Sequence, residues 1–114
     1  MYELTNFKLT LLTSASYFPA ATDFIFNHIH IISSDDMWQI ISVFCETKNI
    51  TGIKRMATYK LSHDEFLNIK PPELVSYGLD VISTIYDSGV KLNVKEIRKC
   101  VDDCDPIAYW CDNL

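Results

Sequence analysis

The chain has 114 residues, of which 48% are hydrophobic and 22% are charged, and this balance excludes a disordered or collagen-like protein. Fifteen acidic against ten basic residues give a formal net charge of -5, which argues against a general nucleic-acid-binding protein because such proteins present a basic face. The length predicts one compact domain over residues 1–114.

Strand-like patterns occur mainly in the N-terminal half. Residues 7–11 alternate apolar and polar side chains, which is typical of a half-buried strand. Residues 19–32 leave two interpretations open: a proline and an aspartate near their beginning suit a helix, whereas the aromatic and β-branched residues of 24–32 favour a strand. We expect a strand over 24–32 and another, irregular one over 53–61.

Helical patterns dominate the C-terminal half, where apolar residues recur at intervals of three and four after each start signal. Ser62 and Glu65 match a capping box, and the longest stripe runs through Gly78 to a left-handed stop at Gly89. The expected helices cover residues 34–48, a short stretch from 62 that Pro71 and Pro72 stop, 72–88, 93–104 and a last turn at 107–111. The predicted fold is α+β, with a small antiparallel sheet from the N-terminal half packed against three to four helices, mostly C-terminal.

The sequence also predicts a cytoplasmic protein that makes no membrane contact. Residues 1–6 lack the basic start of a secretory signal, and no uninterrupted apolar run follows them. The most apolar segment, 24–32, is far shorter than the ~20 residues that cross a bilayer as a helix. In the cytoplasm we expect the cysteines to be reduced thiols.

No motif in the chain names a reaction. The sequence has no glycine-rich phosphate loop, no GxSxG elbow and no HExxH helix, and its three glycines are too few for a dinucleotide cradle. Neighbouring carboxylates such as Asp35 and Asp36 do not face one another on a helix, so they are poor acid–base partners. We therefore expect neither catalysis nor a cofactor.

Two histidines and two cysteines form the strongest candidate metal set. His28 and His30 would share a strand face, Cys100 and Cys104 would share a helix face, and together they could supply a Cys2His2 zinc site. Their spacing is not that of a known zinc finger, and the cysteines serve equally well as small apolar residues on a packed helix. We expect no metal, and a metal- or thiol-dependent protein using these four residues remains an alternative.

The C-terminal edge is the main candidate for binding a partner. Residues 100–114 contain acidic side chains, no basic one, and an adjacent tyrosine and tryptophan, which are favoured at binding hot spots. Such an edge suits a basic protein, through electrostatic steering and a buried aromatic anchor. The competing interpretation is a C-terminal helix packed on the core with its tryptophan inside. The candidate partner-binding residues are Asp102, Asp103, Asp105, Tyr109, Trp110 and Asp112.

These observations favour a small acidic, non-catalytic protein-binding module. Its size and charge are those of immunity proteins, antitoxins and other inhibitors that dock on a basic or nucleic-acid-binding protein, with Trp110, Tyr109 or Trp38 as the anchor. Direct nucleic-acid binding is not expected, because the basic group at 54–60 has too few cations for useful phosphate affinity. A further alternative is a homodimeric structural subunit that pairs through its 24–32 segment.

Overall fold

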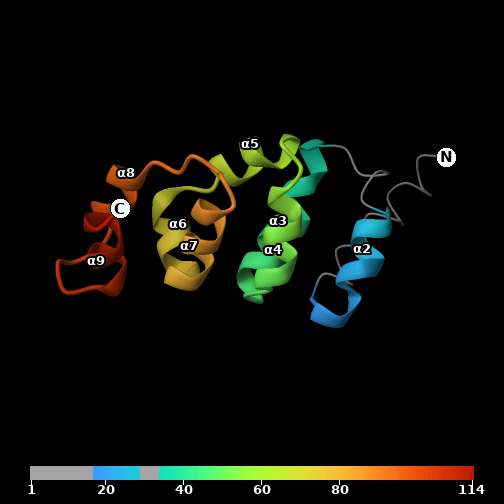
Figure 1. The fold of residues 1–114 in the computed structure, drawn as a ribbon, viewed down its shortest axis with the longest axis horizontal. Coiled ribbons are helices and arrows are strands. Elements are labelled where there is room, and N and C mark those ends of the chain that lie inside the picture. The colour runs from blue at the N-terminus through green and yellow to red at the C-terminus, as the bar shows by residue number, and fades with distance from the viewer. Residues whose placement is uncertain (1–16, 29–33) are drawn as a thin grey trace.

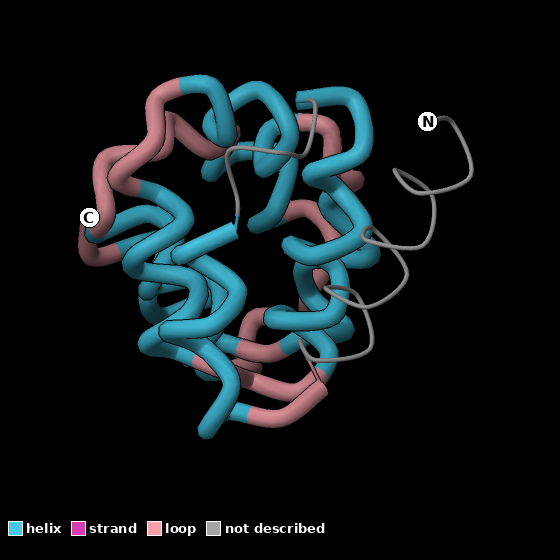
Figure 2. The backbone as a smooth tube through the Cα atoms, turned by 90° about the vertical axis from the view of Figure 1, so that its right-hand side faces the viewer, coloured by secondary structure: helices cyan, strands magenta, loops and turns pink. Residues whose placement is uncertain are grey.

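The computed structural model describes residues 17–28 and 34–114 of the chain. In this part every regular element is a helix, and turns join one helix to the next (Figures 1 and 2). The predicted α+β class is therefore wrong for the described residues, while the predicted strand at 7–11 and residues 29–32 lie outside them. The elements are η1 (Pro19–Ala21), α2 (Thr22–His28), α3 (Ser34–Glu46), α4 (Ile50–Ala57), α5 (Leu61–Leu67), α6 (Pro71–Tyr77), α7 (Leu79–Asp87), α8 (Val94–Arg98) and α9 (Pro106–Asp112).

The helices stack side by side along one long axis, with α2 toward one end and α9 at the other (Figure 1). The principal extents are 51 × 24 × 20 Å and the radius of gyration is 14.8 Å, against about 13 Å for a compact domain of this length. Helix α3 packs on α4 and α5, α4 on α7, α6 on α7 and α8, and α8 on α9. Each helix thus buries a face against a neighbour in the stack. None of the helices in the described ranges has the length and apolar content that a membrane span requires.

Two segments predicted as strands form helices because their buried residues follow a helical period. In α4 the buried residues Ile53, Met56 and Ala57 lie three and one positions apart, so a single helical face reaches the core. In α2 the consecutive residues Ile25 and Phe26 are both buried, which the alternating faces of a strand on one core would not give. Aromatic and β-branched composition is only a weak preference for strands, and packing overrides it here.

The helix predicted from residue 34 is confirmed as α3. Its residues Met37, Ile40, Ile41 and Phe44 are all buried, as their intervals of three and four required. These side chains belong to one hydrophobic cluster that continues through the later helices as far as Ile107. The amphipathic pattern therefore identified both the helix and the face that it buries.

Asn49 connects α2 to the start of α4. Its Oδ1 atom accepts a hydrogen bond from the backbone N–H of Gly52 (3.0 Å), which satisfies one of the free donors of the first turn of α4. Its Nδ2 atom donates to the hydroxyl oxygen of Thr22 in α2 (3.2 Å). The residues that follow the predicted helix over 34–48 thus begin the next helix directly.

The predicted helix over 72–88 is two helices. Gly78 separates α6 from α7 with a φ of 103°, a conformation that L residues rarely adopt and that an α-helix cannot contain. Gly89, after α7, has a φ of 100°, so the predicted left-handed stop there is confirmed. The apolar stripe continued across Gly78, and only the backbone angle shows the break.

Two further boundaries differ from the prediction. Ser62 is not an N-cap, because α5 begins at Leu61 and the Ser62 hydroxyl donates to the carbonyl oxygen of Met56 (2.7 Å). The helix capped by Asn93 is present as α8, with Oδ1 of Asn93 accepting from the backbone N–H of Glu96 (3.3 Å), but it ends at Arg98 rather than near residue 104. The connection 99–105 is therefore not helical.

Candidate functional site

The acidic residues predicted to bind a partner lie together at the C-terminal end of the stack, but most of them have partners within the chain. The guanidinium of Arg98 contacts the carboxylates of Asp103 and Asp112, the latter at 3.2 Å from Nε. Asp105 caps α9 by accepting a hydrogen bond from the backbone N–H of Ile107 (2.8 Å). Within the described residues, Asp102 is the member of this predicted set whose carboxylate has no hydrogen bond or ion pair.

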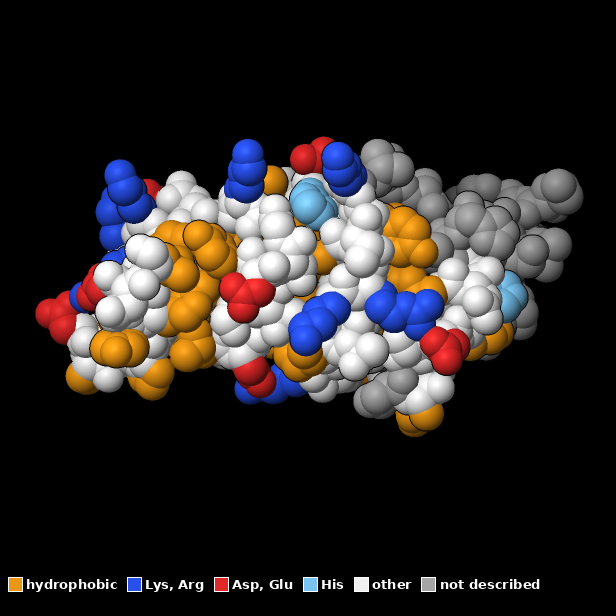
Figure 3. All heavy atoms as spheres, in the orientation of Figure 1, with side chains coloured by type: hydrophobic (Ala, Val, Ile, Leu, Met, Phe, Trp, Pro, Cys, Tyr) orange, Lys and Arg blue, Asp and Glu red, His pale blue; other side chains and the backbone are white. Residues whose placement is uncertain are grey.

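The two aromatic residues of this edge have different roles. The Tyr109 side chain is 73% exposed, whereas Trp110 is half-buried and meets the ring of Tyr86 edge-on, with 5.4 Å between ring centroids. Trp110 therefore stabilises the contact between α7 and α9, which is the competing interpretation of the sequence. The largest apolar gathering in Figure 3 lies toward this end of the molecule.

The charges at the two helix ends that flank the 99–105 connection suit the helix dipoles. A single helix from 93 to 104 would have placed cations at its start and carboxylates at its end, which is unfavourable. In the structure Lys95 and Arg98 lie in the last turn of α8, and Asp105 precedes the first turn of α9. The unfavourable placement of charges therefore belongs only to the single predicted helix, which the structure replaces by two helices.

The predicted metal set is not assembled. His28 belongs to α2, and Cys100 and Cys104 lie on the connection between α8 and α9, near opposite ends of the stack (Figure 1). Nδ1 of His28 donates to the carbonyl oxygen of Phe24 (2.8 Å), and both thiols are exposed rather than packed on a helix face. His30 lies outside the described residues. Among those described, no group of three potential metal ligands occurs.

The basic residues predicted for a strand surface lie on and after α4. Arg55 bonds the Asp23 carboxylate and lies over the Phe26 ring, with 4.4 Å from the guanidinium carbon to the ring centroid. The ring of Tyr59 stacks on the same Phe26 ring, with 6.1 Å between centroids. Arg55 thus serves the contact between α2 and α4, and no continuous basic field is visible in Figure 3.

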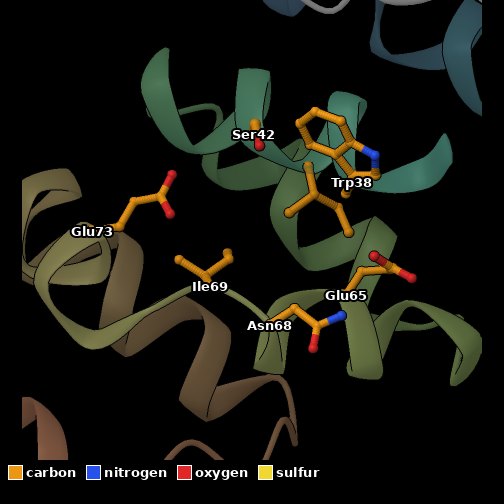
Figure 4. A pocket seen from close by; sticks show the side chains of 7 residues that line it. Trp38, Ser42, Glu65, Asn68, Ile69 and Glu73 are labelled. Carbon is orange, nitrogen blue, oxygen red and sulfur yellow. The ribbon is translucent and has the colours of Figure 1, made fainter. Parts of the chain in front are cut away.

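A hollow of about 310 Å³ beside Trp38 is the candidate functional site. Trp38 and Ser42 project into it from α3, and Glu65 and Asn68 lie across from them, at and just after α5 (Figure 4). Glu73, from α6, lies on the side of the hollow opposite Glu65 (Figure 4). The described residues that line it are Trp38, Ile41, Ser42, Glu65, Asn68, Ile69 and Glu73.

The local sequence explains how α3 presents the indole. Trp38 follows the buried Met37 and precedes the buried Ile41, so it lies at the border of the apolar face. Its side chain is 52% exposed, which is unusual for a residue of this size and polarity in a packed helix. Met37 and Ile41 pack in the core and so fix the position of α3, and the indole of Trp38 extends from this helix into the hollow.

The hollow carries negative charge. Two carboxylates line it, and no lysine, arginine or histidine of the described chain does. The Glu73 carboxylate accepts a hydrogen bond from the hydroxyl of Tyr77 (2.8 Å), and burial together with this bond raises the pKa of Tyr77. The charge of Glu73 thus disfavours the loss of protons from neighbouring groups.

Cys45 is a buried residue of α3, and the charge of Glu73 acts on its thiol. Burial is the main cause that raises the pKa of the Cys45 thiol to about 12, and the charges of Glu73 and Glu46 add to it. A buried neutral thiol of this kind is not a nucleophile at neutral pH. Among the described residues that line the hollow there is neither cysteine nor histidine.

The raised pKa of Cys45 predicts a loss of stability at alkaline pH. The unfolded thiol ionises near pH 8.5 and the folded one near 12, so protons are lost first from the unfolded state as the pH rises. Between pH 7 and pH 10 the wild type is expected to lose about 2 kcal/mol more unfolding free energy than Cys45→Ala. Urea unfolding of both proteins at the two pH values measures this difference, and equal losses would contradict it.

Sequence reasoning named Trp38 only as one of three anchors and did not find the rest of this hollow. Glu65 was assigned to a capping box and Glu73 was not singled out. The walls come from α3, α5, the 68–70 connection and α6, which the hydrophobic pattern does not place relative to one another. The local signal for this site was the position of Trp38 at the border of the apolar stripe of α3, where a large side chain stays partly exposed.

Comparisons of the chain with models of protein families, with curated proteins and with solved structures found no match.

Proposed function

We propose that this chain is a non-catalytic protein-binding module that docks on a basic partner protein through the Trp38 hollow. The observation that supports the proposal is an exposed indole in a concave site that Glu65 and Glu73 also line and that no basic side chain of the described residues lines. An aromatic face and carboxylates are the groups that bind a lysine or arginine side chain.

The size of the hollow favours one side chain over a cofactor. Small-molecule sites in proteins enclose about 300–1,000 Å³, and this hollow lies at the lower limit of that range. A cation stacked on the indole contributes about 0.5–2 kcal/mol, and each hydrogen bond to a carboxylate contributes about 1.5–3 kcal/mol. One arginine or lysine of the partner can therefore serve as the anchor of a larger interface.

The overall charge supports the same partner class. A net charge of -5 attracts a basic protein and raises the association rate, most strongly at low salt. On the C-terminal edge, Asp102 and Tyr109 are the predicted binding residues that remain available for a second contact. A partner that uses the captured cation to hold a phosphate or a substrate would be inhibited, as an antitoxin or immunity protein inhibits its target.

The proposal predicts that an arginine hexapeptide binds at Trp38. We expect it to shift the indole N–H signal of Trp38 in ¹⁵N spectra of the full chain, with the signal assigned by Trp38→Phe. Glu73→Gln, which can still accept from the Tyr77 hydroxyl, is expected to weaken binding at least about fivefold, because a charged hydrogen-bond acceptor is lost.

Asp87→Asn is the matched control, since Asp87 is an exposed carboxylate at the end of α7 and outside the hollow. It changes the net charge by the same amount and is expected to alter the affinity less than twofold. If the two substitutions weaken peptide binding equally, the loss of affinity reflects the change in net charge and not a contact with Glu73. No shift of the Trp38 signal at saturating peptide would contradict the proposal outright.

A further inference from the structure

Tyr77 is a buried residue of α6 that bonds a residue of the Trp38 hollow without being one of its described lining residues. Its hydroxyl donates a hydrogen bond to Oε1 of Glu73 (2.8 Å), which does line the hollow. The two residues lie four positions apart, so they share a face of α6 one turn from each other. The phenol therefore acts on the carboxylate that α6 contributes to the site.

The two ends of this hydrogen bond differ in freedom. The Tyr77 side chain is 9% exposed and belongs to the hydrophobic core cluster, whose packing fixes the ring. Glu73 is exposed, and a glutamate in that situation has several rotamers open to it. The bond thus ties the end of a flexible side chain to a fixed ring.

The Tyr77 hydroxyl keeps its proton at neutral pH. Burial raises the pKa of Tyr77 well above its usual range, and the hydrogen bond to Glu73 and the charges of Glu73, Cys45 and Glu46 raise it further. Tyr77 is therefore the donor and Glu73 the acceptor. Within the described residues, Oε2 of Glu73 has no hydrogen bond or ion pair, so this second oxygen is left for a ligand.

We propose that Tyr77 is a positioning residue of the Trp38 hollow, which holds the Glu73 carboxylate so that Oε2 meets the cationic side chain of the partner. This inference rests on the proposed function and specifies how the site binds, and among the carboxylates of the hollow it depends on Glu73 alone. A side chain that is ordered before binding loses less conformational entropy when the ligand arrives. Holding one glutamate in this way is expected to strengthen binding about three- to tenfold.

Tyr77→Phe tests the inference on the full chain, with the arginine hexapeptide as ligand and the Trp38 indole N–H signal as readout. Phenylalanine keeps the buried ring, so we expect the fold to be retained and the affinity to fall about three- to tenfold. Tyr86→Phe is the matched control, because it removes a tyrosine hydroxyl on α7 that lies outside the lining and has no hydrogen bond within the described residues. It is expected to change the affinity less than twofold.

Two measurements separate positioning from a merely structural role. In a Glu73→Ala background there is no carboxylate to hold, so Tyr77→Phe is expected to change the remaining affinity less than twofold. In the protein without peptide, loss of the hydrogen bond is expected to move the ¹³Cδ signal of Glu73, whereas the ¹³Cγ signal of Asp87, which lies outside the hollow, stays in place.

Each contrary outcome has a distinct meaning. If the wild type binds the peptide and Tyr77→Phe binds it equally well, only this inference fails. If Tyr77→Phe weakens binding equally with and without the Glu73 carboxylate, Tyr77 acts through the packing of α6 and the inference is again overturned. A Glu73 ¹³Cδ signal that does not move shows that the bond is not formed in solution, which also overturns it. If the wild type does not bind the peptide, the proposed function fails and this inference fails with it.

Discussion

Phe44→Ala is expected to lower the free energy of unfolding by about 3–5 kcal/mol, the usual cost of truncating a fully buried phenylalanine. Its ring stacks on Phe26 of α2 at 6.0 Å between centroids, and it lies 3.1 Å from where a Cβ on Gly52 of α4 would be. Three helices therefore lose contacts together. Because small domains have about 5–15 kcal/mol of stability in total, this single change removes a large share of it.

Urea unfolding followed by circular dichroism measures the effect of Phe44→Ala. Trp38→Ala is the control on the same helix, since it removes a larger side chain from a half-exposed position and is expected to cost much less. A loss below about 1 kcal/mol for Phe44→Ala would mean that α2, α3 and α4 do not share a packed core.

Gly78→Ala is expected to destabilise the protein by about 2–3 kcal/mol. The φ of 103° and ψ of 167° at Gly78 belong to a region that is essentially restricted to glycine, where other residues are strained by about 1–3 kcal/mol. A Cβ there would also approach Oδ1 of Asp80 at 3.1 Å and Nζ of Lys48 at 3.2 Å. These two atoms form an ion pair across α7 and the end of α3, which would have to adjust.

The sign of the Gly78 effect distinguishes the structure from the sequence pattern. A continuous helix through residue 78 would make Gly78→Ala stabilising by about 1 kcal/mol, because alanine is the better helix former. Gly89→Ala is the matched control, since Gly89 has a φ of 100° and open space around its Cα, so that it reports backbone strain alone. Thermal unfolding of the three proteins measures both effects.

The two surfaces proposed to meet a partner differ in the residues that form them. At the C-terminal edge, Arg98 holds two carboxylates and the backbone of α9 uses a third, so little of the acidity there is left for a ligand. In the Trp38 hollow Glu65 and Glu73 line a site with an exposed indole, and no lysine or arginine of the described residues lines it. The proposed binding of a basic protein therefore rests on the hollow.

Several elements could be predicted from the sequence because their signals are local. The apolar spacing from Met37 to Phe44 identified α3 and its buried face, Asn93 identified the start of α8, and Gly89 identified the stop after α7. Such features depend on intervals of three and four residues and on backbone angles within one turn. The overall acidity, which supports a basic partner, is likewise fixed by composition.

The tertiary structure alone decided the helical state of residues 24–28 and 53–57, the break at Gly78 and the Trp38 hollow. Short segments rich in aromatic and β-branched residues satisfy helix and strand patterns alike, and packing on the core selects between them. The hollow is formed by side chains up to 35 positions apart, from Trp38 to Glu73, whose proximity depends on how three helices stack. The spacing of residues along the chain does not predict this proximity, because the proximity depends on which faces of different helices are buried against one another.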